Sequence, residues 1–174
     1  MPTVRLADPS LVVLVGPAGS GKSTLAVRHF AADEILSSDA YRKLVSGDEA
    51  DQRATGLAFR RLHDEVARRL RAGRLSVIDA TNLTRHARLT LLARARDADV
   101  PTVAIVLDLA PGIVHARNAG RVTRVVAEAV VDRQLATLRA AIDDDALASE
   151  GFDLVVVLDD PATVDALRFE RQGP

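Results

Sequence analysis

The sequence GPAGSGKS at residues 16–23 follows directly after an apolar run, Leu11–Val15. Its glycines let the backbone curl so that successive N–H groups face an anion, and a helix that begins there points its positive end at the same anion. A lysine and a hydroxyl at these offsets suit nucleotide phosphates and a magnesium ion bound to them. The motif therefore predicts a strand, a phosphate-binding loop and a helix, in a chain that binds a nucleoside triphosphate such as ATP. The predicted contacts are Gly16, Gly19, Ser20, Gly21, Lys22, Ser23 and Thr24.

Composition is typical of a globular chain with one core. The chain has 174 residues, 48% of them hydrophobic and 27% charged, so we expect one domain over residues 1–174. It has no cysteine, which excludes disulfides, thiolate zinc sites and cysteine nucleophiles. No apolar run has the length of a signal peptide or a membrane span, so we expect a cytoplasmic protein with no membrane partner.

Charge is unevenly distributed along the chain. The formal net charge is only −1, which argues against nonspecific coating of nucleic acid but leaves room for a local basic site. Arginines cluster at 60–61, 68–74 and 117–124. The default interpretation of the pairs at 60–61 and 68–69 is a solvated helix face.

Apolar runs alternate with helical periodicity throughout the sequence. Runs rich in β-branched residues favour buried parallel strands, and their alternation with helices predicts a doubly wound α/β domain with five strands and helices on both faces. The predicted strands are 11–15, 34–38, 75–79, 102–107 and 154–158. The predicted helices are 22–32, 52–72, 85–97, 112–118, 127–142 and 162–167.

Two aspartates lie at the carboxyl ends of predicted strands, at the sheet edge where ligands bind in open parallel sheets. Asp79 is predicted to help hold Mg²⁺ together with Ser23; its alternative is a helix N-cap or turn residue. Asp39 is predicted to be a general base for an acceptor hydroxyl, with Arg42 one turn later as a fork for a phosphate. The alternative is a capped helix, with Ser38 or Asp39 as the cap and Arg42 in solvent.

Residues 117–124 hold three arginines and no acidic residue between two predicted helices. Small P-loop kinases carry a lid at this place, so we expect an arginine-bearing lid near 117–126. Arginines that close over phosphates stabilise charge on the transferring group and exclude water. Arg117 and Arg124 are the preferred candidates and Arg121 is the next.

These stretches resemble the N-terminal kinase domain of bacterial polynucleotide kinase–phosphatase, an RNA end-healing enzyme with a P-loop kinase fold. The resemblance runs nearly end to end. It is carried by GPAGSGKST (16–24), SSDAYR (37–42), DEADQRATGLAFRRLHDEVARRL (48–70), VIDATNLTRHAR (77–88), RNAGRVTR (117–124), GFDLVVVLDDP (151–161) and FERQ (169–172).

The resemblance implies transfer of the γ-phosphate of an NTP to a 5′-hydroxyl of RNA or DNA, with Mg²⁺. It implies that Lys22 and Ser23 serve the phosphates and metal, and that Asp39 is the base. Arg42 and Arg117 would grip phosphates at the reaction centre, and Gln52 would lie near the acceptor strand. Arg124 matches a second lid arginine, assigned to the nucleotide. Phosphatase and ligase-like domains and an RNA methyltransferase are the implied partners.

One departure and two alternatives accompany this interpretation. The strand 102–107 is followed by Asp108, where similar proteins commonly have a neutral polar residue, so Asp108 is assigned no role. A small-molecule kinase of the gluconate or shikimate type would use the same loop, base and lid. A nucleotide-dependent switch is disfavoured, since the chain lacks an Asn-Lys-x-Asp motif and an Asp-x-x-Gly switch motif.

Overall fold

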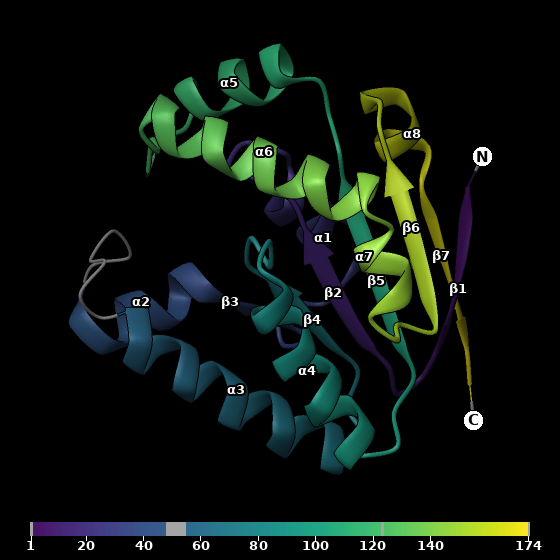
Figure 1. Cartoon of the computed structure of the whole chain (residues 1–174). Helices are drawn as coiled ribbons and strands as arrows, with labels where there is room; N and C mark the ends of the chain where they lie inside the picture. The colour runs from purple at the N-terminus through teal and green to yellow at the C-terminus, as the bar shows by residue number, and fades with distance from the viewer. Residues whose placement is uncertain (1, 48–54, 123, 174) are drawn as a thin grey trace.

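The main sheet of the molecule is parallel throughout. The computed structural model describes residues 2–47, 55–122 and 124–173, and in these residues the sheet has the strand order β3-β4-β2-β5-β6 (Figure 1). This confirms the predicted doubly wound five-stranded sheet. The strands are β2 (Leu11–Val15), β3 (Ile35–Ser37), β4 (Ser76–Asp79), β5 (Thr102–Leu107) and β6 (Leu154–Leu158).

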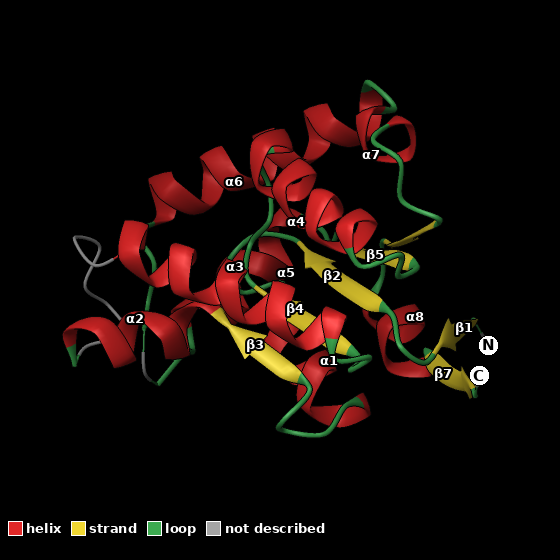
Figure 2. Cartoon of the chain, turned by 90° about the horizontal axis from the view of Figure 1, so that it is seen from below, coloured by secondary structure: helices red, strands yellow, loops and turns green. Residues whose placement is uncertain are grey.

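Helices cover both faces of this sheet. Seen from below, α1 and α8 lie on one side and α3, α4 and α6 on the other (Figure 2). Strands and helices alternate along most of the sheet, as the periodicity predicted. The helices are α1 (Lys22–His29), α2 (Ser38–Ser46), α3 (Thr55–Arg71), α4 (Arg85–Asp97), α5 (Pro111–Ala119), α6 (Glu128–Asp143), α7 (Ala146–Ser149) and α8 (Pro161–Ala166).

The central strand β2 supplies both halves of the core. Its side chains alternate between the two faces, because successive residues of a strand point to opposite sides. Val12 and Leu14 pack in the cluster with α1 and α8, whereas Val13 and Val15 pack in the cluster with α3 and α4. All five residues of β2 are buried, which explains why this strand is a continuous apolar run.

A second, smaller sheet was missed by the sequence interpretation. Strand β1 (Thr3–Ala7) pairs in parallel with β7 (Arg168–Gln172), so the first and last strands of the chain lie side by side, with the N- and C-termini at opposite ends of the pair (Figure 1). Val4 and Leu6 of β1 are buried in the core, but β7 is mostly exposed and polar. Its strand character comes from pairing with β1 and not from a pattern of its own.

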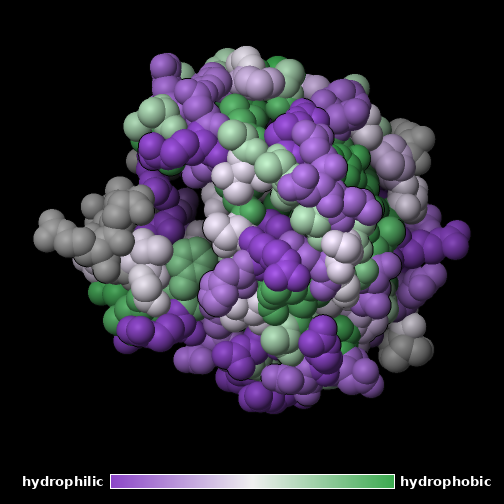
Figure 3. Space-filling model, in the orientation of Figure 1, coloured by the Kyte–Doolittle hydropathy of each residue, from purple (hydrophilic) through white to green (hydrophobic). Residues whose placement is uncertain are grey.

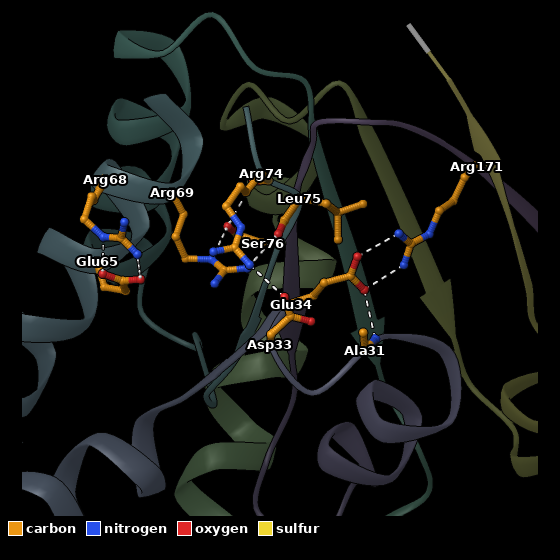
Figure 4. Close-up of polar contacts among 10 residues, drawn as sticks. All are labelled: Ala31, Asp33, Glu34, Glu65, Arg68, Arg69, Arg74, Leu75, Ser76 and Arg171. Atoms are coloured by element: carbon orange, nitrogen blue, oxygen red, sulfur yellow. Dashed lines mark hydrogen bonds and ion pairs between the residues drawn. The ribbon is translucent and has the colours of Figure 1, made fainter. Parts of the chain in front are cut away.

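Ion pairs and hydrogen bonds tie this small sheet to the start of β3. Arg171 of β7 makes two hydrogen bonds of 2.7 Å to the carboxylate of Glu34, and Glu34 also accepts from the N–H of Ala31 (Figure 4). Nearby, Arg74 pairs with Asp33 at 2.7 Å. The C-terminal strand is thereby fixed to the edge of the main sheet.

No helix among the described residues is long and apolar enough to cross a membrane.

Candidate active site

The phosphate-binding loop is built by close backbone packing. Gly19 has a φ of +85°, which favours glycine, and a Cβ there would lie 2.5 Å from the carbonyl oxygen of Val114 and 2.9 Å from the amide nitrogen of Asn118. Both neighbours belong to α5, so the loop lies directly against that helix. Gly21, with a φ of +102°, is the N-cap of α1. The glycines are therefore required by the shape of the loop, as the motif predicted.

The Lys22 side chain is buried against the phosphate-binding loop. Its Nζ donates to the carbonyl oxygen of Pro17 at 2.8 Å and to Ser20 Oγ at 3.4 Å. Burial lowers the pKa of Lys22 from 10.5 to about 8, against the raising effect of Asp79 and with a further lowering by Arg121. Lys22 is thus a buried cation whose charge is sensitive to pH near neutrality, at the position where phosphates would add negative charge.

The two predicted magnesium-binding residues lie together. The Ser23 hydroxyl at the start of α1 donates to Asp79 Oδ2 at 2.7 Å. Asp79 is the last residue of β4, and the parallel pairing of β4 with β2 brings it beside the phosphate-binding loop. A hydroxyl and a carboxylate oxygen side by side are hard oxygen ligands of the kind that Mg²⁺ takes, so these residues fit the ion.

Asp39 lies in the first turn of a helix and not at the end of a strand. The observed strand is shorter than the predicted range 34–38, because β3 ends at Ser37 and α2 begins at Ser38. The cap is Ser37, whose hydroxyl accepts from the N–H of Ala40, so neither Ser38 nor Asp39 has the capping role considered from sequence. Asp39 is therefore left available to the cavity.

Three arginines converge on the Asp39 carboxylate. Arg42 forms an ion pair with Asp39 from the next turn of α2. Arg124 Nη1 lies 3.0 Å from Asp39 Oδ1, and Arg121 Nη2 lies 3.9 Å from Oδ2. Arg124 was assigned to the nucleotide, yet here it contacts the predicted base. Ion pairs therefore connect Arg121 and Arg124 to α2, although more than 80 residues separate them from Asp39 in sequence.

Arg117 lies in the last turn of α5, on the side of the phosphate-binding loop. Its Nη1 lies 3.4 Å from the carbonyl oxygen of Ser20 and the same distance from the place of a Cβ on Gly21. A guanidinium at this position lies over the phosphate-binding loop. Of the lid candidates, Arg117 thus lies nearest the loop, and Arg121 and Arg124 lie by Asp39.

All of these groups open into one cavity of about 1030 Å³. Figure 3 shows a hollow on this face of the molecule, between α5 and α6 at the top and α2 and α3 at the lower left. The predicted site residues that line the cavity are Gly19, Gly21, Lys22, Ser23, Thr24, Asp39, Arg42, Asp79, Arg117 and Arg124. Gly16 and Ser20 belong to the loop itself, and Gln52 lies outside the described residues.

Gln134 is a cavity residue that sequence reasoning missed. Its Oε1 accepts the N–H of Ala18, in the phosphate-binding loop, at 2.8 Å. Gln134 lies on α6 and lines the cavity with Val130, one turn earlier. A single glutamine in an amphipathic helix carries no signal for a contact with a loop 116 residues away. Asp108, which was assigned no role, pairs with Arg139 of α6 at 3.1 Å, and burial raises its pKa.

Comparison with known proteins places this site in a family. A sequence-family model described as an AAA domain matches residues 11–143. No curated protein matches the chain.

Several solved structures have the same fold. The Pnkp1/Rnl/Hen1 RNA repair complex is similar with a TM-score of 0.66 and 18% identity, over 79% of this chain and 46% of that one. A sugar kinase from Janibacter sp. HTCC2649 is similar with a TM-score of 0.59 and 23% identity, over 90% of each chain. The APS kinase CysC of Mycobacterium tuberculosis, solved with AMPPNP and APS, has a TM-score of 0.57 and 16% identity, over 91% of this chain and 92% of that one.

Proposed function

This chain belongs to the AAA domain family, and from that premise and the geometry of its cavity we propose that it is a 5′-hydroxyl polynucleotide kinase. The reaction is transfer of the γ-phosphate of ATP or another NTP to the 5′-hydroxyl end of RNA or DNA, in the repair of broken RNA. The single observation that carries the proposal is that one cavity holds both a phosphate-binding loop and a carboxylate flanked by arginines.

The two groups of residues suit the two substrates. Lys22 and the loop N–H groups serve the phosphates of the NTP. Asp39, across the same cavity, accepts the proton of the attacking hydroxyl. The hydroxyl oxygen bonds to the γ-phosphorus while the bond from that phosphorus to the β–γ bridging oxygen breaks, and the nucleoside diphosphate leaves with the bridging oxygen.

The arginines stabilise the charge that spreads over the transferring group. Arg117 lies over the phosphate-binding loop, and Arg42, Arg121 and Arg124 lie around Asp39. Guanidinium groups held beside the reacting centre act as fixed positive charges and as forks for phosphate oxygens. Mg²⁺ held near Ser23 and Asp79 would supply further neutralisation of phosphate charge.

The choice of a polynucleotide acceptor rests on two further supports. The resemblance to the kinase domain of polynucleotide kinase–phosphatase extends nearly the length of the chain, and the RNA repair complex shares its fold with a TM-score of 0.66. By the same resemblance, phosphatase and ligase-like domains and an RNA methyltransferase are proposed partners, and Gln52 is a proposed contact of the acceptor strand.

A small-molecule kinase is the second candidate. It is favoured by the likeness to a sugar kinase over 90% of both chains. Such an enzyme would use the same loop, Asp39 and lid, so the acceptor is what distinguishes the two proposals.

The test is transfer of labelled γ-phosphate from ATP with Mg²⁺ to a 5′-hydroxyl oligonucleotide. We expect Asp39→Ala to lower turnover about 1000-fold, as for the loss of a general base, with ATP affinity within threefold of wild type. Equal loss of ATP binding and turnover contradicts the assignment of Asp39. A folded, ATP-binding wild-type protein that labels no oligonucleotide contradicts the polynucleotide acceptor, and a panel of sugars and other small alcohols then replaces it.

A further inference from the structure

The positive charge of this chain is concentrated in one stretch beside the cavity. Residues 55–99 contain ten arginines and five carboxylates, a net charge of +5, and the rest of the chain carries −6. This stretch comprises α3, β4 and α4, and the two helices pack against each other on one face of the sheet (Figure 1). These elements are thus net positive, although the total charge of the chain is close to zero.

Several of these arginines are exposed and have no acidic partner among the described residues. They are Arg60, Arg61, Arg71, Arg85 and Arg96, which we call the α3–α4 arginine surface. Of the other five, Arg68 pairs with Glu65, Arg74 with Asp33 (Figure 4), and Arg88 with buried Glu150. Arg69 is buried and donates to Ser76 and to the carbonyl oxygen of Leu75, and Arg94 is only partly exposed. Asp64 and Asp97 are the only exposed carboxylates in the described helices α3 and α4, so the five arginines of this surface outnumber the exposed acids there.

The surface begins at the wall of the cavity. Thr55 and Phe59, in the first turns of α3, line the cavity on the side of Asp39, and Arg60 and Arg61 come directly after Phe59. After β4 has ended at Asp79, Thr81 lines the same cavity, and α4 begins four residues later with Arg85. Both helices therefore lead away from the cavity, each with arginine close to its start.

Two ring side chains of α3 lie on the side of that helix that faces positive charge on α4. Phe59 and His63 lie with their ring centroids 6.3 Å apart. Burial lowers the pKa of His63, and so does the charge of neighbouring Arg94 on α4. Aromatic and imidazole faces beside a row of cations form the combination that binds single-stranded nucleic acid, where bases stack and phosphates follow the positive charge.

We propose that the α3–α4 arginine surface holds the acceptor strand beyond its 5′ end, as a single strand of RNA or DNA that leaves the cavity past Phe59. This inference rests on the proposed function, since it names where that function's acceptor lies. Arg60, Arg61 and Arg85 contact the phosphates nearest the cavity, and Arg71 and Arg96 contact the phosphates further along. Phe59 stacks on a base at the cavity wall. The contacts are to phosphates, so the surface sets affinity and not sequence preference.

The experiment measures binding separately from transfer. A 12-nucleotide single strand with a free 5′-hydroxyl and a fluorophore at its 3′ end is titrated with wild type and with Arg60→Gln/Arg61→Gln, and anisotropy is recorded at several salt concentrations. We expect about tenfold weaker binding in the variant. The slope of log K against log[salt] should fall by about 1.4, because each phosphate contact on a single strand contributes about 0.7. The matched control is Arg5→Gln/Arg133→Gln, which removes the same charge from exposed sites on β1 and α6 and should bind like wild type.

Kinetics with acceptors of two lengths complete the test. A dinucleotide is too short to reach past the cavity, so its kcat/KM should be the same in wild type and in Arg60→Gln/Arg61→Gln. For the 12-nucleotide acceptor, KM should rise about tenfold in the variant, with the same loss of binding as above, and kcat should not change.

The outcomes separate this inference from the proposed function. Equal binding by wild type and variant overturns the arginine surface, whether or not oligonucleotides are phosphorylated, as it would if the surface served an acidic protein. An equal loss in the control also overturns it, because the effect is then one of total charge. Arginine-dependent binding without transfer to any 5′-hydroxyl supports the surface and contradicts the kinase proposal.

Discussion

The two sides of the cavity are built in different ways. On the donor side, a continuous loop is shaped by glycines and by backbone atoms of α5 that lie within 3 Å of where a Cβ of Gly19 would be. On the acceptor side, Asp39 is surrounded by arginine side chains from α2 and from a segment more than 80 residues away. The donor side is thus a property of backbone shape, and the acceptor side is a property of opposed charges on side chains from separate segments.

This difference has a consequence for the response to substitution. Backbone shape is an all-or-none property, because a close-packed loop has no room for an added methyl group. Partly exposed ion pairs contribute little to stability, since solvent and ions screen them. We therefore expect changes on the donor side to affect folding and nucleotide binding together, and changes on the acceptor side to affect turnover alone.

The largest effect is expected from Gly19→Ala. A left-handed backbone conformation costs a residue with a Cβ about 1 kcal/mol, and overlap with the backbone of α5 adds about 2 kcal/mol. The free energy of unfolding, measured in urea, should fall by the sum, and NTP binding should be lost. Gly47→Ala is the matched control, since its φ is +78° but nothing lies within 4 Å of the added Cβ. If both variants lose the same stability, close packing is not what distinguishes the donor side.

Arg124→Gln tests the acceptor side. One fewer cation at the reacting centre should lower kcat about 100-fold. The free energy of unfolding should change by less than about 1 kcal/mol, because the Arg124 side chain is partly exposed and its ion pair with Asp39 is screened. Steady-state kinetics and a urea titration measure the two quantities. A large loss of stability with little loss of turnover would reverse the comparison.

Gln134→Glu sharpens the comparison at a residue that links α6 to the loop. The substitution keeps an oxygen to accept the N–H of Ala18, so the fold should be unchanged. It places a negative charge beside the donor phosphates, so NTP affinity should fall about tenfold. Gln134→Met removes the acceptor without adding charge, and should instead cost about 1 kcal/mol of stability through the unpaired amide. Equilibrium binding and thermal unfolding separate these two effects.

The smallest expected effect is a pH dependence of nucleotide binding. The pKa of Lys22 is lowered to about 8, chiefly by burial, and a bound phosphate favours the protonated lysine. As pH rises through 8, binding must therefore take up a proton, and affinity falls. Between pH 7.5 and 8.5 the Kd for an NTP should rise about threefold.

Calorimetry at pH 8 tests the same lysine directly. In buffers of different ionisation enthalpy it should show about half a proton taken up for each NTP bound. The pH dependence of folding stability has the opposite sign, since stability rises with pH whereas NTP affinity falls. The lowered pKa makes the charged lysine a cost to the native state below pH 8, and this cost falls as pH rises towards 10.5. A Kd that does not change over this range, with no proton uptake, would show that Lys22 stays charged.

Short-range patterns determined most of the fold. The bounds of β2, β5, β6 and α4 agree with the predicted ranges, because parallel strands are continuous apolar runs and an amphipathic helix has a fixed period. The edge strand β6 is such a run although Leu154 and Val157 are exposed. The phosphate-binding loop was identified for the same reason, since its glycines, lysine and serine act within eight consecutive residues. The order of the strands in the sheet could not be predicted from any single segment, because it depends on how separate strands pair.

The helix α2 shows the limit of local patterns. A short strand and a helix follow each other without a connecting turn, so residue Ser37 is both the last of β3 and the cap of α2. Residues 34–38 were predicted as one longer strand because no break in the hydrophobic pattern marks the point where β3 ends and α2 begins. The missed strands β1 and β7 have a related cause, since β7 becomes a strand only by pairing with a segment about 165 residues earlier.

The amino-acid sequence by itself determined that this chain has a phosphate-binding loop, a doubly wound sheet and a pair of aspartates at its carboxyl edge. Only the tertiary structure decided how other distant segments complete the site, with Gln134 on Ala18 and Arg124 on Asp39. The physical reason is the range of the interactions. Periodicity and loop geometry act over a few residues, whereas contacts between side chains depend on how the whole sheet brings separate loops to one edge.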